Sequence, residues 1–261
     1  MKNSKLRVLS NTKVSERYWH MEVEAASIVN EITAGQFFNI KCSGETFPFL
    51  RRPFSIYRIN KDEGTIEFLY LVKGEGTVHL TRVKPDEEVE LLGPLGEGFK
   101  LQESWDTILL LARGVGIATL AALAQEAGEK NIKCIAILSA RSNDDLLATE
   151  TLQTLGAQVY KVTEEDKTSD VDNVEKIIKD IITKNKIDAG FTCGSKRLSR
   201  LLQKLSLENH IPSQIALEEH MGCAMGVCYA CVCDIIEDDK RKSVRVCHDG
   251  PVFELDKVVL K

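Results

Sequence analysis

Four cysteines near the end of the chain constrain it more than any other feature. Cys223, Cys228 and Cys231 follow the pattern C-x4-C-x2-C, and Cys247 comes after a further fifteen residues. This is the spacing with which plant-type proteins hold a [2Fe–2S] cluster, because three thiolates come from one tight loop and the fourth from a returning segment. Small residues separate the cysteines, so backbone N–H groups can approach the inorganic sulfides, and such hydrogen bonds help to set the potential. We therefore predict that these four cysteines bind a [2Fe–2S] cluster.

Other interpretations of the cysteines remain open at this point. Zinc sites more often show paired C-x2-C motifs, and disulfides are disfavoured because no export signal is found. Cys233 follows the loop in an apparent strand, residues 232–236, and is interpreted as a packed thiol rather than a ligand. A structural role is also the default for three cysteines that lie far apart in apolar surroundings, namely Cys42, Cys134 and Cys193.

Length and charge limit the classes of function. The chain has 261 residues, enough for two domains and a small additional unit. Its formal net charge is −5, so no basic surface for nucleic acid is evident. No apolar run approaches the roughly 18 residues that a membrane-spanning helix needs. We expect a cytoplasmic protein that binds neither nucleic acid nor a membrane.

Residues 1–98 are expected to form a β-barrel domain. Short alternating stretches between turns predict strands at residues 17–25, 35–42, 52–59, 65–72 and 88–92. Residues 61–64 are typical of a hairpin turn, and residues 77–83 of a short helix. Six or so strands without long helices favour a closed barrel. Three glycines and a proline at residues 93–98 predict the end of this domain.

Residues 99–217 are expected to form an α/β domain with a parallel sheet, because strands and helices alternate there. Strands are predicted at residues 106–112, 132–139, 158–162, 188–193 and 214–217. Helices are predicted at residues 117–127, 144–155, 171–183 and 196–205. Apolar side chains at helical spacing support the third helix, namely Val174, Ile177, Ile178 and Ile181. The remaining residues, 218–261, are assigned to a small cluster subdomain.

Two segments of the barrel are candidates for binding an anionic cofactor. The run Arg51-Arg52-Pro53-Phe54-Ser55-Ile56 places proline in a predicted strand, where it cannot donate to the ladder, and a binding site would explain it. The run Gly74-Glu75-Gly76-Thr77 precedes a predicted helix, whose free N–H groups favour an anion. Each motif alone is a weak signal, since Arg-Pro pairs and glycine turns are common.

A third candidate is the turn Arg113-Gly114-Val115-Gly116, between the first strand and first helix of the α/β domain. Such turns hold a pyrophosphate on the helix N-terminus. Packing alone would explain the two glycines equally well. Arg141 and Ser142 follow the second strand, where a cofactor ribose or a solvated turn would lie.

The order of these features resembles the electron-transfer subunit of NAD-linked, type B dihydroorotate dehydrogenases, within the ferredoxin–NADP⁺ reductase superfamily. The resemblance covers nearly the whole chain. It rests on the barrel motifs above, on Gly35-Gln36-Phe37, Leu69-Tyr70-Leu71, Gly93-Pro94-Leu95-Gly96 and Cys193-Gly194, and most specifically on residues 222–231 and 246–253.

The resemblance implies three cofactors and a partner. An FAD would be held in the barrel by Arg52, Pro53, Phe54, Ser55, Leu69, Tyr70, Leu71, Gly76 and Thr77. NAD(H) would bind over the second domain, near Arg113, Gly114, Gly116, Cys193 and Gly194. A separate FMN-containing catalytic subunit would oxidise dihydroorotate to orotate, in a heterotetramer with two subunits of each kind. The chain itself would be a relay without catalytic side chains of its own, because the cofactors supply the chemistry.

The nucleotide turn departs from the family pattern. The family usually has Gly-Gly-Gly-x-Gly-x-x-Pro there, and residues 112–119 lack two of the glycines and the proline. Ser195 stands where a proline often follows Cys-Gly. Arg113 adds bulk that could cover the turn, but also a cation suited to phosphate, and we expect nucleotide binding to survive. Two alternatives therefore stay open: an electron-transfer subunit of another oxidoreductase, or a redox-sensing flavo-iron–sulfur protein with a non-functional nucleotide site.

Overall fold

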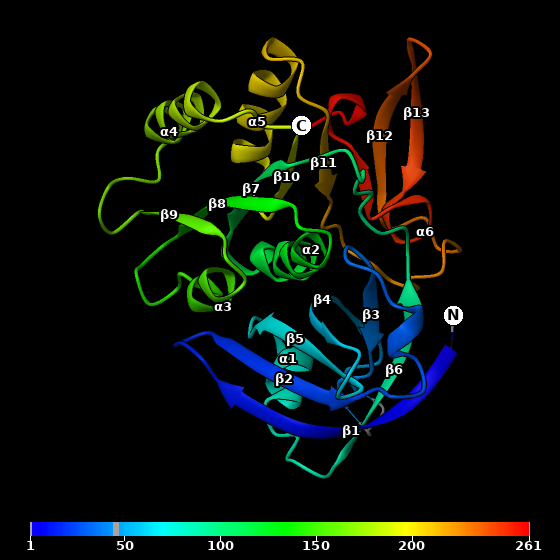
Figure 1. The fold of residues 1–261 in the computed structure, drawn as a ribbon. Helices are drawn as coiled ribbons and strands as arrows, with labels where there is room; N and C mark the ends of the chain where they lie inside the picture. Colours follow the sequence, from blue (N-terminus) through cyan, green and yellow to red (C-terminus); the bar gives the residue numbers. More distant parts are fainter. Residues whose placement is uncertain (1, 44–46, 261) are drawn as a thin grey trace.

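The computed structural model describes residues 2–43 and 47–260. Residues 1 and 261, which begin and end the predicted domain ranges, lie outside the described residues. Figure 1 shows a barrel, an α/β unit stacked on it, and a C-terminal hairpin unit beside both. The predicted fold class, a β-barrel joined to a parallel-sheet α/β unit, is confirmed.

The barrel is closed and antiparallel, with the strand order β1-β2-β5-β4-β3-β6. Its elements are β1 (Lys2–Lys13), β2 (Tyr18–Glu24), β3 (Phe37–Ile40), β4 (Arg52–Asn60), β5 (Thr65–Leu71), helix α1 (Glu75–Leu80) and β6 (Glu88–Leu95). A 3₁₀ turn, η1 (Val29–Glu31), lies between β2 and β3. Alternate side chains of the strands, such as Phe38, Ile56 and Phe68, fill the interior. The predicted strands and the hairpin between β4 and β5 are confirmed.

Three details of the barrel differ from the sequence prediction. β1 is absent from the prediction because only Leu6 and Val8 of this largely polar strand are buried. The last strand, predicted at residues 88–92, continues to Leu95. A side chain on Gly93 would lie 2.4 Å from the ring of Phe38, so close packing explains this glycine. Helix α1 covers Glu75–Leu80 rather than residues 77–83.

The α/β unit has the strand order β14-β11-β10-β7-β8-β9, parallel throughout except for β14. Its first half contains β7 (Thr107–Arg113), turn η2 (Gly114–Gly116), α2 (Ile117–Glu129), β8 (Lys133–Ala140), α3 (Thr149–Thr154) and β9 (Gln158–Thr163). Its second half contains α4 (Val171–Lys184), β10 (Ala189–Cys193), α5 (Lys196–Glu208), β11 (Ser213–Ala216) and β14 (Val252–Glu254).

The long helices agree with their apolar patterns. Val174, Ile178 and Ile181 of α4 are buried, and Ile177 packs at the margin of the same cluster. Helix α3 is shorter than the predicted 144–155, because the chain turns through residues 142–148 and Ala148 has a left-handed backbone with φ of 60°. Helix α2 passes through Gly128, where an end was predicted, and stops at Glu129.

Helix α2 joins the barrel to the sheet. Its many alanines are buried, and their small side chains allow close packing against Tyr57 and Leu69 of the barrel and against the sheet. Figure 1 shows α2 between β4 and the strands of the sheet. The candidate cofactor-binding segments of the barrel therefore lie on one side of this packed interface, and those of the α/β unit lie on the other side.

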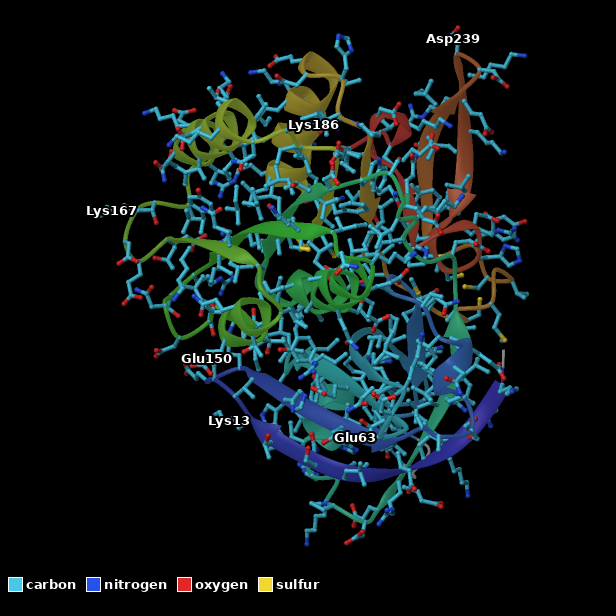
Figure 2. The ribbon with its side chains drawn as sticks, viewed as in Figure 1. Lys13, Glu63, Glu150, Lys167, Lys186 and Asp239 are labelled. Carbon is cyan, nitrogen blue, oxygen red and sulfur yellow. The ribbon has the colours of Figure 1, made fainter. Side chains whose placement is uncertain are left out.

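The C-terminal unit begins with the cysteine-containing loop after β11 and continues with β12 (Val232–Glu237), β13 (Lys240–Arg245), α6 (Val246–Asp249) and η3 (Leu255–Lys257). The hairpin of β12 and β13 projects outward, with Asp239 at its tip (Figure 2). Phe37 and Leu95 of the barrel pack with Cys231 and Cys247, which anchors the loop to the barrel. Within residues 2–43 and 47–260, no helix is long and apolar enough to cross a membrane.

Candidate functional site

The loop between β11 and β12 folds around the sulfur atoms of the predicted ligands. Sγ of Cys223 accepts the N–H groups of Met225 (3.4 Å), Val227 (3.3 Å) and Cys228 (3.4 Å). Sγ of Cys247 accepts the N–H of Gly226 at 3.2 Å. Backbone donors therefore surround the cysteine sulfur atoms.

The four thiols form two pairs. The side chains of Cys223 and Cys228 interact with one another, and those of Cys231 and Cys247 do the same, with the N–H of Cys247 also donating to Sγ of Cys231 at 3.4 Å. No three His, Cys, Asp or Glu side chains in the described part of the chain converge on one ion position. A two-iron cluster needs two thiolates for each tetrahedral iron. The paired arrangement fits a [2Fe–2S] cluster.

The electrostatics of the two pairs differ. Burial acts to raise the pKa of Cys223, but the N–H groups of Met225, Cys228 and Val227 and the Cys228 thiol outweigh it and lower this pKa to about 6. Burial, followed by the neighbouring Cys231 thiol, raises the pKa of Cys247 to about 12. The Cys223 thiol, on the more exposed side of the loop, thus favours its thiolate form even without a bound metal ion.

The loop conformation is a costly one for its sequence. Ala224 and Tyr229 have positive φ angles of 56° and 58°, and Gly226 has a φ of 77°. Non-glycine residues in this region are uncommon and concentrate at functional sites. Cys233 lies outside the loop, in β12, where burial raises the pKa of its thiol to about 11. It is therefore a packed strand residue, as predicted.

A cleft of about 780 Å³ lies between the barrel and the other two units. Among its lining residues are all but one of the predicted FAD residues: Arg52, Pro53, Phe54, Ser55, Leu69, Tyr70, Leu71 and Thr77. The exception, Gly76, is buried beneath the cleft, where an added side chain would lie 3.3 Å from Nε of Arg52. The residues that the sequence predicted separately are thus brought to one place.

The chain fixes the polar groups of this cleft. The guanidinium of Arg52 donates to the carbonyl oxygens of Leu50 (2.6 Å) and Arg51 (3.2 Å). The hydroxyl of Thr77 accepts the N–H groups of Lys73 and Gly74, so it shapes the turn before α1. The mostly apolar wall with one oriented arginine suits a flat ring system carrying phosphates.

Sequence reasoning missed the opposite wall of the cleft. That wall comes from the α/β unit and the segment before the cysteines: Val115, Ala118, Lys196, Leu217, Glu218, Glu219, His220, Met221 and Pro251. Met221 lines the cleft and also packs beside the cysteine cluster, so it faces inward. Only tertiary packing brings these residues together. Val115 and Pro251 belong to motifs named from the sequence, but those motifs did not point to this cleft.

A second cavity of about 320 Å³ adjoins the first at Leu71, Lys73, Val115 and Glu218. Arg113, Gly114 and Gly194 line it, as does Arg141. Cationic side chains from both domains meet there, namely Arg17 and Lys73 from the barrel and Arg113 and Arg141 from the α/β unit. The cavity is therefore suited to an anionic ligand placed next to the larger cleft.

Close packing explains the glycines of the nucleotide turn. An added side chain on Gly116 would lie 2.7 Å from the backbone of Cys193 and Gly194. Gly194 has a φ of +93°, and its added side chain would lie 2.2 Å from the carbonyl oxygen of Arg113. The predicted turn at residues 113–116 and the predicted Cys193-Gly194 motif therefore pack directly against each other. Ser195, found where the family often has proline, caps α5 by accepting the N–H of Leu198 at 3.3 Å.

Arg113 is tied to the neighbouring strand ends. One of its guanidinium nitrogens donates to Oγ of Ser139 at 2.7 Å, and the other forms an ion pair with Glu164. Neither the covering position nor the free phosphate clamp considered from the sequence describes this arrangement. Its donors are largely used within the protein.

Glu218 is a functional candidate that the sequence reasoning missed. It lines both cavities, and the buried thiol of Cys193 lies 3.8 Å from its Oε1. Glu218 is exposed to the cleft, but the protein atoms around its carboxyl desolvate it and raise its pKa. A carboxyl in this position would contact ligands on both sides.

The fold and the cysteine loop define the class of protein. It has a ferredoxin reductase-like fold with a C-terminal iron–sulfur binding domain. A structure of an NADH-dependent reduced ferredoxin–NADP oxidoreductase superposes with a TM-score of 0.80 at 22% identity, covering 98% of this chain and 90% of that one. Ferredoxin–NADP⁺ reductase from Plasmodium falciparum gives 0.64 at 12% identity, covering 82% and 96%. The profile of the iron-sulfur cluster binding domain of dihydroorotate dehydrogenase B matches residues 218–259.

Full-length relatives identify the family. The electron transfer subunit of dihydroorotate dehydrogenase B (NAD⁺) from Caldanaerobacter subterraneus subsp. tengcongensis is 35% identical and covers 98% of both chains. The same subunit from Bacillus pumilus is 32% identical over 100% of this chain and 99% of that one. The chain belongs to the family of electron transfer subunits of NAD⁺-dependent dihydroorotate dehydrogenase B.

Proposed function

We propose that this chain transfers electrons between NAD(H) and a partner dehydrogenase that oxidises dihydroorotate to orotate, a step of pyrimidine biosynthesis. The observation that carries the proposal is the adjacency of three sites: the cationic cavity, the larger cleft and the cysteine loop. When bound, FAD exchanges a hydride with NAD(H), and a [2Fe–2S] cluster carries single electrons onward. The remaining work of the protein is to bind, orient and exclude water.

The larger cleft is proposed to hold FAD. Arg52 would hold a phosphate or a ring edge, Ser55 would contact the ring system, and Leu69, Tyr70 and Leu71 would form its wall. Gly76 and Thr77 shape the start of α1 next to Arg52. Together with Pro53 and Phe54 these are the residues predicted from the sequence.

The smaller cavity is proposed to hold the phosphates and the nicotinamide end of NAD(H). Gly114 and Gly194 line it, while Gly116 and Cys193 lie behind them and hold the turn in place. Arg17, Lys73 and Arg141 are the candidate phosphate contacts, because they line this cavity from both domains. Because the two cavities share Glu218 and Val115, a ligand in one would meet a ligand in the other.

The cluster is proposed to be bound by Cys223, Cys228, Cys231 and Cys247. Phe37 and Met221 line the cleft and also pack with Cys231 and Cys247, so they separate the proposed flavin site from the sulfur atoms. A gap filled by side chains that contact both sites suits electron transfer. Thiolate ligands of this kind are kept reduced in the cytoplasm, which is the proposed location.

The partner is proposed to dock on the outer side of the cysteine loop. Met225, Val227 and Tyr229 are exposed there, the last two by 74% and 64% of their surface. Exposed apolar side chains around a cofactor loop are typical of an interaction site. The partner would be an FMN-containing catalytic subunit, in a heterotetramer with two subunits of each kind.

The test is anaerobic addition of NADH to the purified holoprotein, followed by visible absorbance, with NADPH added in parallel. Bleaching of the flavin followed by reduction of the cluster supports the proposal. An unchanged flavin with both nucleotides would instead favour a redox sensor, or a subunit with another electron donor. Hydrogen exchange of residues 220–232 with and without the partner tests the docking surface, and equal exchange in both states would contradict it.

A further inference from the structure

Arg245 connects the two segments that carry the cysteines. It is the last residue of β13 and directly precedes α6, which contains Cys247. One guanidinium nitrogen donates to the carbonyl oxygen of Gly226 at 3.0 Å, in the loop with the other three cysteines. The guanidinium also lies 5.4 Å from the ring centre of Tyr229, on the same loop. A single side chain thus closes the loop onto the segment of the fourth cysteine.

Asp249 fixes the direction of this side chain. Its carboxylate accepts the backbone N–H of Arg245 at 2.8 Å, Nε at 3.1 Å and Nη2 at 3.0 Å. Nη2 also lies 3.3 Å from Nδ1 of His248. An arginine held by two bonds to one carboxylate is oriented as well as charged, because the fork geometry admits few alternatives. Most of this side chain is sheltered, with 26% of its surface exposed.

The carbonyl that Arg245 binds belongs to a peptide group that also contacts a ligand sulfur. The other side of that peptide is the N–H of Val227, which donates to Sγ of Cys223 at 3.3 Å. The N–H of Gly226 itself donates to Sγ of Cys247 at 3.2 Å. A cation on the carbonyl polarises the peptide and strengthens the hydrogen bond that its N–H donates. Arg245 therefore acts on Cys223 through the Gly226–Val227 peptide, and it holds in place the residue whose own N–H donates to Cys247.

We propose that Arg245 is a positioning residue that holds the cluster loop closed and raises the reduction potential of the cluster, and that Asp249 limits this effect. The inference rests on the cluster of the proposed function. Reduction adds negative charge to the cluster, so a nearby cation and stronger N–H···S bonds stabilise the reduced form. A nearby carboxylate has the opposite effect.

Redox titration of the purified holoprotein, with the reduced cluster measured by electron paramagnetic resonance, tests the proposal. For Arg245→Gln we expect about a tenfold lower ratio of reduced to oxidised cluster at a fixed potential, which is about 59 mV for a one-electron couple. For Asp249→Asn we expect a shift in the opposite direction. Arg245→Lys keeps the charge without the fork and should recover more than half of the shift. Arg241→Gln is the matched control, since Arg241 also lies in β13 but pairs with Asp234, and it should shift the ratio less than threefold.

The opposite signs separate this role from a purely structural one. If Arg245 and Asp249 only supported the loop, Arg245→Gln and Asp249→Asn would shift the potential in the same direction, and that result would overturn the proposal. If Arg245→Gln loses its cluster, Asp249→Asn and Arg245→Lys decide: a raised potential in the first and a lowering by less than half of about 59 mV in the second support the proposal, and any other pair of shifts overturns it. A wild-type protein without a cluster signal would refute the proposed function instead.

Discussion

Replacing Gly116 by alanine isolates the contact between the two turns of the nucleotide site. Gly116 has an ordinary helical φ of −58°, so alanine carries no backbone penalty there. Its added methyl group would lie 2.7 Å from the carbonyl carbon and oxygen of Cys193 and from Cα of Gly194. All of these atoms belong to the backbone, which cannot move aside as a flexible side chain would. Gly194→Ala would be a less clean test, because that residue also has a positive φ.

Overpacking of this kind typically costs about 1–3 kcal/mol. For a chain of this size each kcal/mol lowers the melting temperature by about 2–4 °C. We expect Gly116→Ala to melt several degrees lower and to show a raised Michaelis constant for NADH in flavin reduction. The cluster spectrum should remain, because the cysteine loop does not depend on this contact.

Gly128→Ala is the matched control in the same helix. Within the described residues nothing lies within 4 Å of its added methyl group, and removing a glycine from a helix stabilises it by about 0.5–1 kcal/mol. This variant should melt slightly higher and reduce its flavin normally. If Gly116→Ala melts like the wild type and keeps its Michaelis constant, the two turns are not packed as described, and the assignment of the nucleotide site to them loses its support.

Three further predictions concern the proposed ligands and the cleft. Serine at each of the four proposed cluster ligands should remove or destabilise the cluster, whereas Cys233→Ser should leave its absorbance spectrum intact; loss of the cluster in Cys233→Ser would contradict the ligand set. Arg52→Ala should weaken FAD retention on the order of tenfold to a hundredfold, because a charge-assisted hydrogen bond contributes about 1.5–3 kcal/mol, and full occupancy after dialysis would argue against this role. Burial raises the pKa of Glu218, so its carboxyl gains negative charge as the pH rises through a value above that of an ordinary glutamate. The Michaelis constant for NADH should rise over that range and be flat in Glu218→Gln; an identical pH profile in both proteins would show that Glu218 does not meet the nucleotide.

The parts of the site that could be predicted from the sequence are those encoded locally. The cysteine spacing needs only a loop and one return, and in the structure the backbone N–H groups of Cys228 and Cys247 donate to the sulfur atoms of Cys223 and Cys231. The strands with alternating apolar residues and the amphipathic helix α4 also follow from short-range patterns. The residues that we propose to bind FAD were predicted from the family resemblance, and strand β4 and the turn before α1 also carry motifs of their own.

The parts that could not be predicted depend on contacts between distant segments. β1 is largely polar and becomes a strand because the barrel must close between β2 and β6. Lys196, Glu218 and Met221 come from separate stretches and meet only when the α/β unit packs on the barrel. Gly93 looked like a boundary, whereas it is required by the ring of Phe38 on the neighbouring strand.

Arg113 shows how such distant contacts alter the interpretation of a local motif. In a turn that usually has glycine, an arginine suggests either obstruction or a phosphate clamp. The structure binds its guanidinium to Ser139 at the end of β8 and to Glu164 just after β9, so the side chain joins strand ends while the glycines still form the turn. Its charge is offset by Glu164, which leaves Arg17, Lys73 and Arg141 as the candidates for phosphate. We therefore expect Arg113→Gly to change the Michaelis constant for NADH less than threefold. A tenfold increase would mean that Arg113 leaves Glu164 to bind the nucleotide, and faster reduction at low NADH would mean that it obstructs the site after all.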